Sequence, residues 1–168
     1  MTGSIQRNVM GLDWGRQPDE AFAVVIDASD GSVKAACAGP VTGYRSTRLW
    51  LHALAYEWRI DSIWAEANSV GGPNIEALQA EGLPVIAAQS SRSSMTTLIQ
   101  NVMLAAERGD LILRDGNPLL RIMSACEFFE KHGVVLYRIP YGEKDSPLVA
   151  LALAWHGVNN SAAGISFV

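Results

Sequence analysis

The chain has 168 residues and a formal net charge of -4, with 49% hydrophobic and 18% charged residues. This composition excludes a disordered chain and allows one substantial core, so we expect a single domain over residues 1–168. No apolar run approaches the roughly 20 residues of a membrane helix, and the polar start of the chain lacks a signal-peptide core. We therefore expect a cytoplasmic protein without a membrane partner.

The acidic balance and the two cysteines narrow the possible functions. Non-specific affinity for nucleic acid comes mainly from Lys and Arg, so a net negative chain is not expected to bind DNA tightly by itself. Cys37 and Cys126 are too few and too far apart in the chain to predict a disulfide framework or a zinc site. We interpret both as small apolar side chains of the core.

The N-terminal part of the chain predicts three consecutive antiparallel strands. Residues 9–15 and 21–27 are apolar runs, and residues 32–38 follow the hairpin-turn signal Asp30-Gly31. Helices and strands then alternate. The expected helices cover residues 47–59, 74–81 (capped by Asn74), 93–108, 117–131 and 147–156, and the expected strands cover residues 62–67, 83–88, 111–113 and 134–139. This order predicts an α/β protein, a mixed sheet with helices on both faces.

Three acids lie within or beside predicted buried elements. Asp13 lies in the first strand, Glu66 in the fourth, and Asp145 directly before the last helix. An isolated buried carboxylate costs several kcal/mol, so each needs a cation, a hydrogen-bond network or a metal ion. Clustered carboxylates suit Mg²⁺ or Mn²⁺, and two such ions roughly 4 Å apart activate water against a phosphodiester. Taken singly, each acid also fits an edge position or, for Asp145, a helix cap.

Several segments, in order along the chain, carry a resemblance to one family. They are residues 11–16 followed by Asp19, residues 64–68 followed by Gly71, residues 98–101, and residues 144–154. Together they resemble the nuclease domain of phage terminase large subunits. The resemblance implies a ribonuclease H-like fold, in which three antiparallel strands are followed by parallel strands with helices on both faces.

The same resemblance implies an activity, a cofactor and partners. It implies a hydrolase, a divalent-metal-dependent endonuclease that cuts double-stranded DNA during viral genome packaging in the host cytoplasm. Asp13, Glu66 and Asp145 are then the catalytic ligands of two Mg²⁺ or Mn²⁺ ions, with Asp19 and Ser146 as auxiliary residues. The implied partners are double-stranded DNA, an ATPase domain, and the packaging motor and portal. The sequence has no phosphate-binding loop of the form GxxxxGK[ST], so we expect no ATPase domain within it.

Two departures from the family pattern keep other functions open. Ser146 stands where many relatives carry a second acid, and Met95 stands near the place of a lysine. A degenerate nuclease fold that docks DNA or the portal is therefore one alternative, and a Holliday-junction-resolvase-like nuclease is another. The first strand is also similar to the phosphate loop of actin-like and sugar kinases, but those proteins need two such domains, for which the chain is too short.

Several further residues are weaker candidates. Four cations fall in predicted loops near the acids and are either phosphate contacts or solvated surface charges: Arg16, Arg45, Arg92 and Lys144. Ser90 and Ser91 belong to a polar loop that either contacts a DNA backbone or starts a helix. The histidines fall on predicted helices without metal-ligand spacing, and Trp14 and Trp64 are expected to point away from the neighbouring acids.

Overall fold

The computed structural model describes residues 7–15, 21–68 and 71–162, and its centre is a five-stranded mixed sheet. The strands are β1 (Asn8–Asp13), β2 (Phe22–Asp27), β3 (Ser32–Ala38), β4 (Ile60–Glu66) and β5 (Val85–Ala88), in the order β3-β2-β1-β4-β5. The β1–β2 and β2–β3 pairs are antiparallel, whereas β1–β4 and β4–β5 are parallel. The predicted mixed sheet is therefore confirmed.

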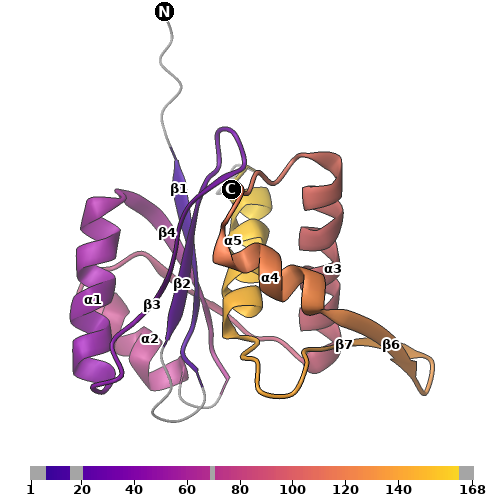
Figure 1. Cartoon of the computed structure of the whole chain (residues 1–168). Coiled ribbons are helices and arrows are strands. Elements are labelled where there is room, and N and C mark those ends of the chain that lie inside the picture. The colour runs from indigo at the N-terminus through magenta and orange to yellow at the C-terminus, as the bar shows by residue number, and fades with distance from the viewer. Residues whose placement is uncertain (1–6, 16–20, 69–70, 163–168) are drawn as a thin grey trace, which may run out of the picture.

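Helices cover both faces of this sheet, as Figure 1 shows. One face carries α1 (Tyr44–Glu57) and α2 (Gly71–Ala80), and the other carries α3 (Arg92–Arg108), α4 (Pro118–Ala125) and α5 (Ser146–Ala162). Successive strand residues point to opposite faces. Met10 and Leu12 accordingly join the core beneath α1 and α2, while Val24 and Ile26 join the core beneath α3 and α5.

A glycine in β1 allows α5 to lie directly on the strand. A Cβ atom at Gly11 would lie only 1.9 Å from the carbonyl oxygen of Ala150 and 2.4 Å from the backbone nitrogen of Ala154. No side chain fits in that space, so glycine is the residue that permits this packing. The close approach brings the first turn of α5 to the carboxyl end of β1.

The predicted helix over residues 117–131 is wrong beyond Ala125. The chain forms a hairpin there, in which β6 (Glu127–Lys131) pairs antiparallel with β7 (Val134–Arg138). His132 and Gly133 have positive φ values of 52° and 75°, as a two-residue type I′ turn requires. The apolar residues of β6 resemble a helical stripe in sequence, but pairing with β7 decides their conformation. His132 is consequently a turn residue and lies on no helix.

Three smaller expectations also differ from the structure. Helix α2 begins at Gly71, so Asn74 lies within the helix, buried, and does not cap it. Residues 111–113 form one isolated bridge, Ser32 with Ile112, and no strand of their own.

The two cysteines, on either side of the sheet, are half-buried against the cores. Among the described residues, no helix is both long and apolar enough to cross a membrane.

Candidate active site

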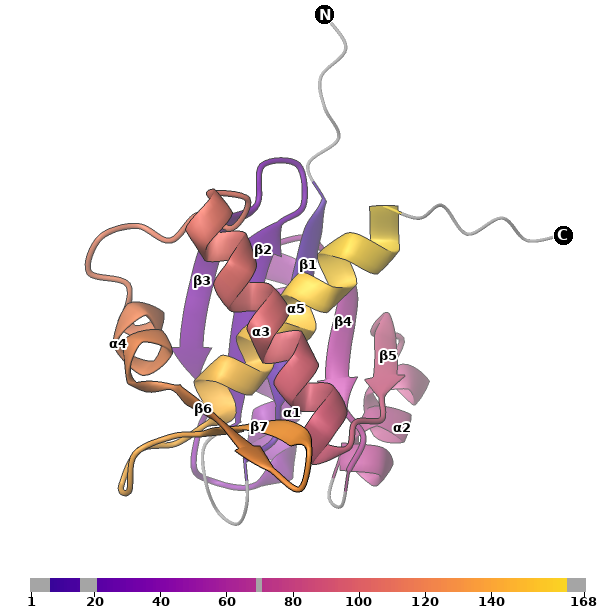
Figure 2. The same ribbon diagram turned by 90° about the vertical axis from the view of Figure 1, so that its right-hand side faces the viewer.

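A cleft of about 780 Å³ opens where β1 and β4 end and α5 begins. Helix α3 and strand β7 contribute its other walls, and Figure 2 shows the β6–β7 hairpin beside the starts of α3 and α5. The lining residues are Asp13, Trp14, Gly15, Glu66, Asn68, Ser90, Ser91, Arg92, Met95, Tyr137, Arg138, Ile139, Glu143, Lys144, Asp145, Ser146 and Val149. Asp13, Glu66 and Asp145, far apart in sequence, thus lie in one cleft.

The strand register explains why two of these acids face the same way. Leu12 pairs with Ala65 across the parallel β1–β4 ladder, and both are buried beneath α1 and α2. The next residue on each strand, Asp13 or Glu66, therefore points to the opposite face, toward α5. Asp145 joins them because it directly precedes α5: its carbonyl accepts the backbone N–H groups of Leu148 and Val149, at 2.9 and 3.0 Å. Asp145 therefore lies at the start of α5 and lines the cleft, while its role as a metal ligand stays a prediction.

Asp13 is a partly buried acid of the site with a strongly raised pKa. Burial is the main cause that raises its pKa to about 7, and the charges of Glu66 and Asp145 add to the effect. The Ser146 hydroxyl donates a hydrogen bond to Asp13 and partly offsets this rise, whereas a hydrogen bond shared with Glu66 favours the protonated form. Burial and the neighbouring carboxylates thus both favour the protonated form of Asp13.

Glu66 is held by two hydrogen-bond donors. Its Oε1 atom accepts the Asn68 amide and the Ser90 hydroxyl, each at 2.9 Å. The Asn68 amide also donates to the Ser90 carbonyl at 2.9 Å. These bonds tie the end of β4 to the loop before α3 and fix the direction of the Glu66 carboxylate.

Asp145 is held from the other side of the cleft by the hairpin. The Tyr137 hydroxyl donates to Asp145 Oδ2 at 2.9 Å. Burial, followed by the charge of Asp145, raises the pKa of Tyr137 far above its usual value, so the hydroxyl keeps its proton. The carboxylate therefore faces a neutral donor that remains a donor at working pH.

Two of the four cations expected near the acids line the cleft. Arg92 and Lys144 line the cleft, and Arg92 Nη2 donates to the Tyr137 carbonyl at 3.3 Å. Arg45 is exposed in the first turn of α1 and not in a loop, and it is not a lining residue of the cleft, so the structure does not bring it to this site. Arg16 and Asp19 lie outside the described residues.

The polar loop and the tryptophans have definite structural roles. Ser91 caps α3 in a reciprocal capping box with Ser94, which agrees with the helix-start interpretation, while Ser90 binds Glu66. Trp14 packs beneath α1 and α2, away from Asp13, as expected. The same expectation is wrong for Trp64, which packs against the α3–α5 core on the face of Glu66, because residues two apart on a strand share a face.

Sequence reasoning missed Tyr137 and Asn68. Tyr137 was assigned to a strand without a site role, because the wrong helix over 117–131 concealed the hairpin that carries it to Asp145. A signal was available: residues 128–129 and 134–137 are β-favouring runs that flank a His-Gly turn. Arg138 and Glu143 were missed for the same reason, and both are engaged in ion pairs, Arg138 with Glu127 and Glu143 with Arg121.

The donor set of the cleft fits a divalent cation. Its three acids offer the hard oxygen ligands that Mg²⁺ and Mn²⁺ prefer, and the pKa of Asp13 is raised mainly by burial and further by the neighbouring acids. No three His, Cys, Asp or Glu side chains within the described ranges are already spaced as a closed ligand set.

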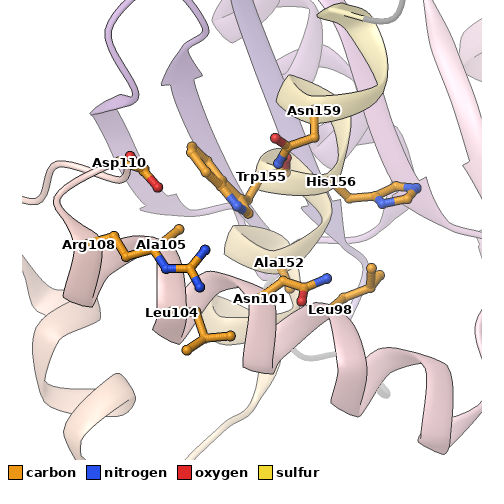
Figure 3. Close-up of a pocket in the computed structure, with 10 residues that line it drawn as sticks. All are labelled: Leu98, Asn101, Leu104, Ala105, Arg108, Asp110, Ala152, Trp155, His156 and Asn159. Carbon is orange, nitrogen blue, oxygen red and sulfur yellow. The ribbon is translucent and has the colours of Figure 1, made fainter.

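A second hollow, of about 320 Å³, lies between the later turns of α3 and α5 (Figure 3). Its floor includes Ala105 and Ala152, and its charged groups are Arg108 and Asp110 beside His156 and Trp155. Burial lowers the pKa of His156, which favours the neutral ring. This hollow contains none of the site residues expected from the sequence and no group of acids, so the carboxylate chemistry belongs to the cleft.

The strand order, the helices on both faces and the acids at the ends of β1 and β4 define a ribonuclease H-like fold. Among solved structures, the chain is similar to the large terminase nuclease of thermophilic phage G20c with bound magnesium, at a TM-score of 0.80 and 20% identity, covering 92% of this chain and 82% of that one. The Thermus phage P74-26 large terminase nuclease domain gives a TM-score of 0.76 at 20% identity, covering 90% and 80%.

A third structure extends this likeness beyond those two phages. The nuclease domain of the large terminase subunit gp2 of bacterial virus Sf6 gives a TM-score of 0.67 at 14% identity, covering 92% of this chain and 90% of that one. No protein-family model and no curated protein sequence matches the chain. The fold is thus that of large terminase nuclease domains, the group that the sequence segments resemble.

Proposed function

We propose that this chain is a divalent-metal-dependent endonuclease that hydrolyses phosphodiester bonds of double-stranded DNA during phage genome packaging. The observation that carries the proposal is the cleft itself: Asp13, Glu66 and Asp145 line it together, and the pKa of Asp13 is raised to about 7. Stability alone does not favour such a cluster of like charges, so a perturbed carboxylate in a cleft is a candidate for function.

The fold comparison supports the cofactor and the substrate class. The similar structures include the G20c nuclease with bound magnesium and with bound cobalt, and an Sf6 nuclease domain with manganese. In the proposed site, Asp13, Glu66 and Asp145 would hold Mg²⁺ or Mn²⁺. When bound, such ions lower the pKa of a water nucleophile and neutralise charge that develops on the phosphate.

The chain's own residues have separate tasks in this proposal. Asn68 and Ser90 orient Glu66, and Ser146 donates to Asp13 and so favours its ionised form, which is the form that binds a cation. Arg92 and Lys144 lie on the wall of the cleft, where they can contact phosphates. With a net charge of -4, most of the grip on DNA would come from a partner, which we propose is the ATPase domain or packaging motor with its portal.

The arrangement around Ser146 favours an active nuclease over a degenerate docking module. Ser146 is buried beside Asp13 and donates a hydrogen bond to it, so the family's second acid is replaced here by a group that serves the remaining acids. A decayed site would have no need to keep three carboxylates together in one cleft, each with its own hydrogen-bond donor. We therefore propose that Ser146 is an auxiliary residue of a working site.

Plasmid cleavage by the purified protein tests the proposal. We expect nicking and linearisation with Mn²⁺ or Mg²⁺ and none with excess chelator. Asp13→Asn, Glu66→Gln and Asp145→Asn should each lower the rate by more than about 100-fold, beyond the range for residues that only support a ligand. Asp115→Asn, at an exposed loop position, is the matched control and should cut at the wild-type rate. Cleavage that survives chelation, or that survives in all three cleft variants, would exclude this site.

A further inference from the structure

Tyr137 is the point at which the hairpin meets the acid cluster. It is partly buried on β7, where it pairs with Phe128 of β6, and it lines the cleft together with Asp145. Its hydroxyl donates to Asp145 Oδ2 at 2.9 Å. The side chain of Tyr137 thus spans from the hairpin to an acid that belongs to the start of α5.

The main chain around Tyr137 also has hydrogen-bond partners. Arg92 Nη2, from the first turn of α3, donates to the Tyr137 carbonyl at 3.3 Å. Pairing with β6 holds the neighbouring residues of β7 in register. Tyr137 therefore connects α3, the hairpin and Asp145, and its hydroxyl has a fixed position from which to donate.

The backbone of Asp145 is similarly fixed, but its side chain needs a separate restraint. The first turn of α5 holds the Asp145 carbonyl through Leu148 and Val149, which leaves rotation about the side-chain bonds undecided. A hydrogen bond to one carboxylate oxygen selects a rotamer and directs the other oxygen. A neutral phenol does this without cancelling the negative charge, whereas an Arg or Lys partner would compete with a bound cation.

We propose that Tyr137 is a positioning residue of the active site: its hydroxyl holds Oδ2 of Asp145 so that this carboxylate stays turned into the cleft as a ligand for a divalent cation. The inference rests on the proposed nuclease function, and it assigns to the hairpin a direct part in building the site. Tyr137 acts through Asp145 and not on the substrate.

Tyr137→Phe tests this role with little disturbance, because the aromatic ring stays and only the hydroxyl is lost. We expect Mn²⁺ binding to the DNA-free protein, measured by titration calorimetry, to weaken by about 10-fold, within the range for losing a group that supports a metal ligand. The Mn²⁺ concentration for half-maximal cleavage should rise by the same factor. At saturating Mn²⁺ the cleavage rate and the KM for DNA should return to near the wild-type values.

Tyr141→Phe is the matched control, because Tyr141 is fully exposed. It should bind Mn²⁺ and cut DNA as the wild type does. Thermal unfolding in chelator should leave all three proteins cooperatively folded, with the Tyr137→Phe midpoint within a few degrees of the wild type, as loss of one hydrogen bond predicts. This separates a positioning effect from a loss of fold.

The outcomes distinguish this inference from the proposed function. If the wild type binds Mn²⁺ and cuts DNA but Tyr137→Phe matches it within about twofold, a difference too small for a ligand-supporting group, the positioning role is excluded and the nuclease assignment stands. If the variant instead has a higher KM for DNA at unchanged Mn²⁺ affinity, Tyr137 contacts substrate and the inference is wrong. If the wild type neither binds Mn²⁺ nor cuts DNA, both proposals fail together.

Discussion

The same two helices line two very different hollows. The first turns of α3 and α5 face the cleft, where Asp13, Glu66 and Asp145 lie together. Their later turns face the hollow of Figure 3, where Arg108 and Asp110 are both exposed to solvent. The cleft partly buries one acid, Asp13, beside two others, although cations also lie on its wall. In the second hollow both charged groups are solvated. The difference indicates that the cleft is maintained at a cost to stability, which marks it as the functional end of the helix pair.

The largest effect we predict is a gain of stability when the charge of the partly buried Asp13 carboxylate is removed. Asp13 has a pKa of about 7 in the folded chain, against an ordinary value of 3.8 for an aspartic acid side chain. Below about pH 4 both the folded and the unfolded state are protonated and no penalty exists; the penalty grows as the pH rises through 7 and is then constant. At roughly 1.4 kcal/mol per pKa unit it reaches about 4 kcal/mol.

Asp13→Asn should therefore raise the free energy of unfolding by a few kcal/mol at pH 8 in chelator, and by little at pH 4. Urea unfolding at both pH values measures this, with Asp115→Asn as the exposed control. If Asp13→Asn is no more stable than the wild type at pH 8, the ionised Asp13 does not destabilise the fold. The cleft would then not differ from the second hollow in its cost to stability.

A smaller effect is expected from the donors that hold Glu66. Ser90→Ala removes one of the two hydrogen bonds to Oε1 while it leaves the Ser90 carbonyl bound to Asn68. We expect cleavage at limiting Mn²⁺ to fall by about 10-fold, or about 1.4 kcal/mol. Ser93→Ala, in the same polar stretch but not lining the cleft, is the control. Equal rates for the two variants would show that the Glu66 network is not part of the site.

The smallest effect compares the two ends of one helix. Helix α3 begins with Arg92 in the cleft and ends with Arg108 in the second hollow. Arg92→Gln should weaken DNA binding by a few fold and flatten its salt dependence by about one unit of slope, as loss of one phosphate contact predicts. Arg108→Gln should leave both unchanged. Binding measured over a salt series decides this, and an equal loss in both variants would assign DNA contact to both ends of α3.

The two sides of the cleft also differ in how far sequence could predict them. The side with Asp13 and Glu66 could be predicted, because both acids end apolar strands and neighbouring parallel strands bring their carboxyl ends to the same edge of the sheet. The side with Tyr137 could not be predicted. Residues 126–131 are compatible with a helix or a strand. Their conformation is decided by pairing with β7 across a tight turn, a contact that the local sequence pattern does not specify.

Arg45 and Trp64 illustrate the same division. Arg45 follows β3 at the correct end of the sheet, but the connection carries it to the α1 face, which loop position alone does not reveal. Trp64 lies two residues before Glu66, so strand periodicity alone places it on the face of Glu66.

By itself the sequence determined the order of the elements from β1 to α3, the mixed sheet and the strand-end positions of two acids, because these follow from local periodicity and from turns between neighbouring segments. The tertiary structure decided which face each helix covers and how Asp145 reaches Asp13. It also decided that a hairpin donor holds Asp145. The physical reason is that these features depend on contacts between distant segments, such as the close approach of α5 to Gly11, whose energies no local pattern encodes.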